Sequence, residues 1–374
     1  RVAPGTSLLE PSCALGSRAM NARSAVRLRV LAGNTALVLV GLSASAAALH
    51  TLPPVPTEMT YGDRRIERAR PWCEVLFIGP SYVKAQIIEP VFDQEAKRLG
   101  VPMRSCKFGG TGVRGIELQL HLTRLLRRSW PKLRFVVIDI TLREGLAFER
   151  ENWFKARYIQ WHTWESMPWI LRSYQRRPSQ ASLTNYAGHA AHLAANYSNL
   201  GTGIELFSRL HVVTRLRALV GAKVRVPRAD VERQYTSELR SWERRKKAQA
   251  HTNLSPAAWK RHRQKLASLI RGKRAARKHA GNRDDAWPRE LRAWVEQRGF
   301  EPVFLNAPVW RPVREMKPRT RPLVVLDFND PERFPVLYEP KNRGRTHHLS
   351  WYGGVEYSKL LAHDMAKLWT GKRQ

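Results

Sequence analysis

The sequence predicts an α/β protein built on a doubly wound parallel sheet of about five strands. Short apolar runs rich in β-branched residues, which are typical of buried parallel strands, alternate with amphipathic stretches of helical period. This alternation occurs on both sides of a long middle segment that lacks it. Because strands that alternate with helices form parallel sheets with right-handed crossovers, we expect both stretches to contribute to one sheet.

The first stretch is expected to supply three strands and the helices between them. Strands are predicted at 74–78, around 103–108 and at 133–140. A helix is predicted at 83–99, after the first strand. A second helix follows the second strand, and its apolar side consists of Leu118, Leu122, Leu125 and Leu126.

The second stretch is expected to complete the sheet. A helix at 288–297, ending near Gly299, is followed by strands at 302–306 and 323–328. A closing helix is predicted at 355–369.

The middle segment, 143–285, is predicted to be a helical insertion over the active-site face. It is rich in Trp and Arg. The aromatic residues of 152–164 either bind a sugar or form a local core. The strongly basic part, 240–283, is expected to be a solvated helix packed on the domain, and nucleic acid is not expected as a partner of an exported protein.

Polar residues follow the carboxyl ends of the first three strands. Ser81 comes directly after Gly79-Pro80, at a predicted helix amino terminus, where free N–H groups favour developing negative charge. Gly109 and Thr141 follow the second and third strands. Ligands of such sheets bind beyond these strand ends. Ser81 is therefore a candidate nucleophile, with a plain helix cap as the alternative.

These residues, together with His348 before the closing helix, resemble the SGNH (GDSL-like) hydrolase superfamily, whose fold is flavodoxin-like. The residues 77–81 stand where the family has Gly-Asp-Ser or Gly-Ser-Ser. The residues 108–112 look like its second block and 136–141 look like its third strand. The residues 327–335 are similar to a stretch found in uncharacterised, membrane-anchored bacterial members.

The resemblance implies a serine esterase or O-acyltransferase that needs no cofactor or metal. Ser81 would be the nucleophile and His348 the general base. The N–H groups of Ser81 and Gly109 would form the oxyanion hole. Thr141 stands where the family carries an oxyanion-binding Asn. The implied substrate is an acylated carbohydrate, such as envelope polysaccharide, or another small ester.

The sequence departs from the family at the group that orients the histidine. Arg345 stands where the family commonly has an Asp, three residues before the catalytic histidine. Asp330 and Asp139 remain candidates for the orienting acid, a backbone carbonyl could orient the histidine instead, and His347 is the alternative base. A catalytically inactive relative that binds an anionic glycan or a partner protein is therefore the second hypothesis.

The amino-terminal part predicts export. Residues 1–29 form an extension and a basic n-region, and 30–49 form an uncharged, mainly apolar run. This run is a signal anchor in the inner membrane or a cleaved signal peptide, and a buried helix of the globular body is the alternative. Residues 50–71 are expected to be a Pro-rich linker, and 72–370 the α/β domain. The body is expected to face the periplasm or the cell exterior, or to be secreted.

Charge and cysteine usage add two expectations. With 65 Lys and Arg against 31 Asp and Glu, the net charge is +34, which predicts attraction to anionic surfaces. An arginine-rich source genome is the alternative explanation. Cys73 and Cys106 flank two strands that could be neighbours, so they either form a disulfide in an exported protein or remain reduced in the core. No Cys/His spacing indicates zinc.

Overall fold

The computed structural model describes residues 22–50, 58–111, 113, 115–141, 156–176, 178, 181–198, 255–278, 286–310, 323–344 and 348–371. The chain divides into two units, 1–53 and 54–374. The described part of the first unit is the helix α1 (Ala22–His50), which includes the predicted apolar run. Within these described ranges, no helix is long and apolar enough to cross a membrane.

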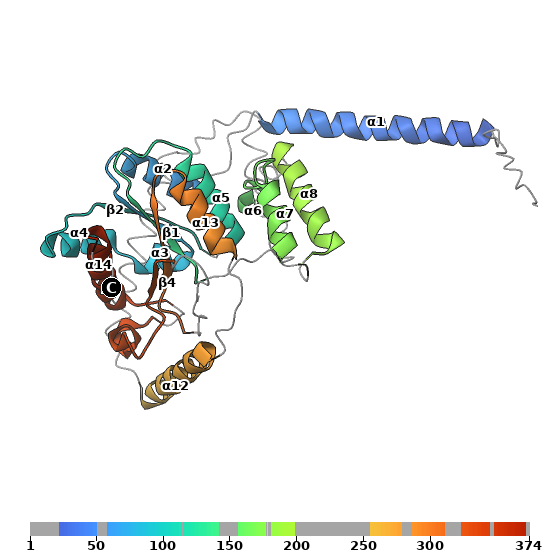
Figure 1. Ribbon diagram of the computed structural model, residues 1–374. Coiled ribbons are helices and arrows are strands. Elements are labelled where there is room, and N and C mark those ends of the chain that lie inside the picture. Colours follow the sequence, from blue (N-terminus) through green and yellow to red (C-terminus); the bar gives the residue numbers. More distant parts are fainter. Residues whose placement is uncertain are drawn as a thin grey trace, which may run out of the picture. The chain divides into compact units, whose positions relative to one another are not determined.

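The second unit is built on a five-stranded, all-parallel sheet, as the sequence predicts (Figure 1). The strands are β1 (Val75–Gly79), β2 (Ser105–Gly109), β3 (Phe135–Asp139), β4 (Glu301–Asn306) and β5 (Val325–Asp327). Their order is β2-β1-β3-β4-β5, so the direction of winding reverses between β1 and β3. Open α/β sheets bind ligands beyond the carboxyl ends of their strands at such a reversal point.

Helices cover both faces of this sheet. One face carries α2 (Glu58–Ala69), α5 (Gly115–Leu126) and α13 (Ala286–Glu296). The other carries α4 (Glu89–Arg98), α12 (Pro256–Lys278) and α14 (Trp351–Trp369). The side chains of β1 alternate between the two cores: Leu76 and Ile78 face the first core, and Val75 and Phe77 the second. The 3-10 helices η3 (Pro335–Tyr338) and η4 (Pro340–Asn342) precede α14.

Two local expectations differ from the structure. The helix α2 lies in the stretch assigned to a linker, and it joins the domain because Ile66 and Ala69 are buried in the first core. The helix expected at 83–99 is broken into α3 (Ser81–Gln86) and α4. The break precedes Pro90, which has no N–H to donate and therefore fits the first turn of a new helix rather than the interior of a continuous one.

The described part of the insertion consists of helices and the turns between them, without strands. Its described helices are α6 (Ala156–Ile159), α7 (Met167–Arg176), α8 (Leu183–Tyr197) and α12. The hydroxyl of Ser255 accepts a hydrogen bond from the N–H of Ala258, as expected of a residue that caps α12. Leu269 anchors α12 in the second core, and the buried Lys273 pairs with Asp327 at 3.1 Å.

A chain of buried neutral rings links the helices of the insertion. The hydroxyl of Tyr174 donates to Nε2 of His189 (2.8 Å), and Nδ1–H of His189 donates to Nε2 of His162 (2.8 Å). Nδ1–H of His162 donates to the carbonyl of Tyr158 (2.7 Å). Because the carbonyl oxygen of Tyr158 can only accept, it fixes the donor and acceptor of every hydrogen bond in this series. Each imidazole is neutral, and it donates one hydrogen bond and accepts one.

This chain predicts acid sensitivity. Burial and the neighbouring histidines lower the pKa of His162 to about 2 and that of His189 to about 3, from a usual value of 6.5. Below about pH 6.5 the unfolded chain binds protons that the folded chain does not. The free energy of unfolding is therefore expected to fall from pH 6.5 to about pH 3, by ~1.4 kcal/mol per pH unit for each histidine. Above about pH 7 both histidines are neutral in the folded and the unfolded chain, so they no longer make the free energy of unfolding depend on pH.

Urea unfolding at several pH values measures that slope. In the variant His189→Gln, the slope of the free energy of unfolding against pH should be smaller by the equivalent of about one proton, whatever the stability of the variant at neutral pH. An unchanged slope in this variant would contradict the assignment of buried neutral histidines.

Candidate active site

The helix α3 brings Ser81 to the carboxyl edge of the sheet. Ser81 is its first residue, directly after β1, and is half-buried. Pro80 takes the capping position and makes no side-chain cap. The side chain of Ser81 is therefore not used as the cap that the alternative explanation requires.

Two glycines let α3 lie directly on the strand ends. A Cβ on Gly109 would lie 2.5 Å from the backbone nitrogen of Lys84 in α3. A Cβ on Gly79 would lie 2.5 Å from Cγ2 of Val83 and 2.6 Å from Cβ of Asp139. The φ of Gly79 is not positive, so this glycine is needed for space rather than for a left-handed backbone. Gly79 and Gly109 are also paired in the β1–β2 ladder, which puts α3 over both strands.

Replacing Gly109 by alanine is expected to destabilise the fold by about 1–3 kcal/mol, because backbone of α3 or β2 must move to relieve the overlap. Urea unfolding measures this loss. Gly62→Ala is the matched control, since a Cβ there meets only the ring of Phe108, at 3.0 Å, and alanine favours the helix. Equal or greater destabilisation in the control would contradict the close packing of α3 on β2.

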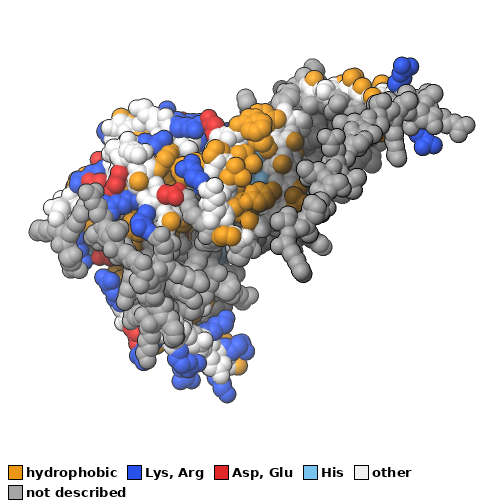
Figure 2. All heavy atoms as spheres, turned by 45° about the vertical axis from the view of Figure 1, so that its right-hand side comes forward, with side chains coloured by type: hydrophobic (Ala, Val, Ile, Leu, Met, Phe, Trp, Pro, Cys, Tyr) orange, Lys and Arg blue, Asp and Glu red, His pale blue; other side chains and the backbone are white. Residues whose placement is uncertain are grey.

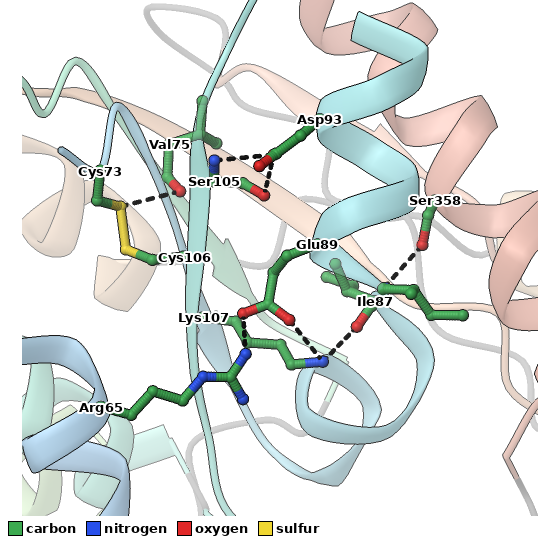
Figure 3. A network of polar contacts seen from close by, with 11 residues as sticks. Arg65, Cys73, Val75, Ile87, Glu89, Asp93, Ser105, Cys106, Lys107 and Ser358 are labelled. Carbon is green, nitrogen blue, oxygen red and sulfur yellow. Dashed lines mark hydrogen bonds and ion pairs between the residues drawn. A yellow bond between two sulfur atoms is a disulfide. The ribbon is translucent and has the colours of Figure 1, made fainter. Parts of the chain in front are cut away.

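A polar network fixes the break between α3 and α4 (Figure 3). Nζ of Lys107 in β2 donates to the carbonyl of Ile87 and pairs with Glu89 at 3.1 Å. Glu89 also binds Arg65 of α2 at 2.5 Å. The N–H of Ile88 donates to the hydroxyl of Ser358 in α14 (2.8 Å). The orientation of α3 is therefore set by contacts with the sheet and with helices on both faces.

His348 reaches α3 from the other end of the chain. Its Nδ1 lies 3.4 Å from Nε2 of Gln86, and its ring centroid lies 5.1 Å from that of Tyr82. An isolated bridge between Arg343 and Leu349, and the hydrogen bond from Gly344 N–H to the His348 carbonyl (3.0 Å), hold its backbone. The structure thus brings His348 to the helix that begins with Ser81.

Gln86 is a residue that the sequence did not single out. Its side chain is fully buried, and its Oε1 has no hydrogen-bond partner in the described part of the chain. Because the two ends of an amide are interchangeable in shape, a half-turn of this amide brings Oε1 to Nδ1 of His348. The carbonyl oxygen would then accept Nδ1–H and leave Nε2 of the ring unprotonated.

The other described residues that the sequence predicted for the site follow or end strands, and they hydrogen-bond to backbone N–H groups. Oδ1 of Asp139 accepts the N–H of Thr141 (2.8 Å), and Oγ1 of Thr141 accepts the N–H of Ala307 (2.7 Å). The hydroxyl of Thr141 therefore links the ends of β3 and β4. Oδ1 of Asp330 accepts two N–H groups of the turn that follows it, at 3.0 and 3.3 Å. Arg345 and His347 lie outside the described residues.

Arg343, in the segment between η4 and α14, is a buried arginine. Arg343 is 8% exposed, and its Nη1–H donates to the carbonyl of Pro308 (3.0 Å). Its guanidinium lies over the rings of Tyr338 and Trp310, at 4.2 and 4.5 Å. Within the described part of the chain, its Nε and Nη2 are buried without a hydrogen-bond partner. Burial lowers the pKa of this guanidinium to about 10, although the neighbouring Tyr338 acts to raise it. The guanidinium is therefore charged at neutral pH.

A separate pocket of about 130 Å³ opens between α2, α5 and the segment that joins α6 to α7. Its lining includes Trp161 and the ion pairs Arg124–Asp63 and Arg127–Glu165. None of the site residues predicted from the sequence lines it. Among the described residues, no group of three or more His, Cys, Asp or Glu side chains could hold a metal ion.

No protein-family model, no curated protein and no solved structure matches this chain. The resemblance to SGNH hydrolases therefore rests on the stretches 77–81, 108–112 and 136–141 and on His348.

Proposed function

We propose that this protein is an exported serine esterase or O-acyltransferase of the SGNH type, acting on acylated carbohydrate or another small ester. One observation carries the proposal: the ring of His348 contacts α3, which begins with Ser81 and packs on Gly109. A serine, a histidine and a glycine from three separate segments of the sequence thus lie at the carboxyl edge of one parallel sheet, where ligands of such sheets bind.

In the proposed mechanism, Oγ of Ser81 attacks the ester carbonyl and Nε2 of His348 takes its proton. The N–H groups of Ser81 and Gly109 stabilise the oxyanion, at about 3 kcal/mol of barrier for each donor. The carbon–oxygen bond to the alcohol then breaks, and the alcohol leaves with the proton from His348. Water or a second hydroxyl group, activated by the same histidine, releases the acyl group from Ser81.

Gln86 takes the place of the missing acid in this mechanism. Its carbonyl oxygen would hold Nδ1–H of His348, which fixes the ring and the reactive tautomer. A neutral amide stabilises the imidazolium formed during attack less than a carboxylate does, so the rate is expected to be low.

Hydrolysis of p-nitrophenyl acetate by the full chain tests this function. Gln86→Glu should raise kcat, because a carboxylate stabilises the imidazolium, and Gln86→Leu should lower it by about 10-fold or more. A folded protein without hydrolysis, and without gain in Gln86→Glu, would contradict the enzymatic proposal.

The disulfide between Cys73 and Cys106 supports the proposed export, because disulfides persist in oxidising compartments. The disulfide joins Cys106 in β2 to Cys73, which lies two residues before β1. The signal anchor or signal peptide at 30–49 remains part of the proposal.

A second function, binding of an anionic glycan or an acidic partner without catalysis, is favoured by Arg343. A buried guanidinium whose Nε and Nη2 lack partners in the described residues is costly, and an anionic group would offset that cost. Calorimetric titration with polygalacturonate would distinguish the two functions. Binding that is lost in Arg343→Gln, in a protein without esterase activity, would favour the second.

A further inference from the structure

On the face of the molecule that Figure 2 shows, exposed hydrophobic side chains gather over the insertion. Seven large apolar side chains are exposed in the described part of this unit, and five of them lie between residues 164 and 197. Together they are called the apolar face: Trp164 (67% exposed), Leu171 (44%), Leu183 (86%), Tyr186 (39%) and Tyr197 (51%). Trp164 and Tyr197 touch, with ring centroids 6.0 Å apart.

The helix α8 supplies most of this face and has no charged residue, although 26% of the chain is charged. Its buried side, which includes His189 and His192, packs within the insertion. Its exposed side is also apolar, with four alanines between the tyrosines: Leu183, Tyr186, Ala187, Ala190, Ala191, Ala194 and Tyr197. A helix that is apolar toward solvent as well as toward the core is expected to have a partner on its outer side.

Charge and composition identify the kind of partner. A second copy of this chain would bring two bodies of net charge +34 together, whereas an anionic lipid surface attracts such a charge. Trp and Tyr side chains, with an apolar body and a polar tip, are enriched at the boundary between lipid and water. The exposed Arg172 is the sequence neighbour of Leu171 in α7, and its guanidinium lies 4.2 Å from the Trp169 ring. We propose that the apolar face docks on the interface of an anionic bilayer, independently of residues 30–49.

The test uses the full chain with Cys13→Ser, in vesicles of phosphatidylcholine and phosphatidylglycerol in equal parts. Cys73 and Cys106 are joined in a disulfide, so a new cysteine can be labelled alone with a polarity-sensitive nitrobenzoxadiazole dye. The test positions are Leu183→Cys and Tyr186→Cys on α8. The control is Lys359→Cys on α14, whose native side chain is 45% exposed. A nitroxide-labelled lipid reports contact with the bilayer by quenching.

We expect the dye at both α8 positions to shift to shorter wavelength and to be quenched by the nitroxide lipid, while the control is not. Adding Trp164→Glu to either labelled chain should reduce the quenching without lowering the thermal midpoint, because this side chain is exposed. Absence of quenching at both α8 positions would overturn the proposal. So would a wavelength shift that needs no lipid and grows with protein concentration, because it would assign the face to a second copy.

Discussion

Replacing Ser81 by alanine is expected to lower kcat/KM for p-nitrophenyl acetate by about 10³-fold or more. The substitution removes the attacking oxygen and leaves the oxyanion donors and the binding surface in place. The fold should be unaffected, because Pro80 rather than Ser81 takes the capping position of α3 and alanine favours a helix. The thermal midpoint of the variant should therefore equal that of the parent protein.

Ser182→Ala provides a matched control. The hydroxyl of Ser182 caps α8 by accepting the N–H of Asn185 (3.2 Å), so its loss should cost about 1 kcal/mol of stability. Its activity should remain at the parent level. Hydrolysis that survives in Ser81→Ala and is lost in Ser182→Ala would mean that the reaction depends on the insertion rather than on α3.

Removing the disulfide is expected to have the largest effect on stability. Cys73 and Cys106 are 33 residues apart, and in the chain-entropy model a closed loop of this length contributes about 3–4 kcal/mol. Cys73→Ala with Cys106→Ala should lower the free energy of unfolding by that amount, as measured with urea. A reducing agent should destabilise the parent protein similarly and should not affect the double variant.

Thiol titration provides an independent check of the same bond. The denatured full chain has three cysteines, so it should show one reactive thiol before reduction and three afterwards. Three thiols before reduction would contradict the disulfide and would remove the support that it gives to export.

The sheet could be predicted from the sequence because its strands carry a local signal. The run expected at 74–78 is β1, shifted by one residue, and 302–306 is part of β4. Parallel strands buried on both faces need continuous apolar side chains, which is visible without any knowledge of their partners. The helix α2 was not predicted, because among its described side chains, 62–69, only Ile66 and Ala69 are buried, on a core supplied by distant parts of the chain.

Only part of the site could be predicted, because some of its contacts join residues that are far apart in the sequence. Ser81 and Gly109 follow strands, and topology alone brings strand ends to one edge. The contact of Gln86 with His348 joins residues 262 positions apart, and no local pattern marks a glutamine in a helix as the neighbour of a histidine. The burial of Arg343 between two aromatic rings likewise depends on how the segment before α14 folds.

Covalent labelling tests the central proposal, that Ser81 is activated by His348, most directly. The full chain would be treated with a fluorophosphonate, which forms a stable bond with an activated serine, and the modified residue would be located by peptide mass spectrometry. We expect one adduct, on Ser81, and slow or no labelling in His348→Ala. Labelling that is absent from Ser81, or that proceeds equally fast in His348→Ala, would contradict a Ser81–His348 catalytic pair.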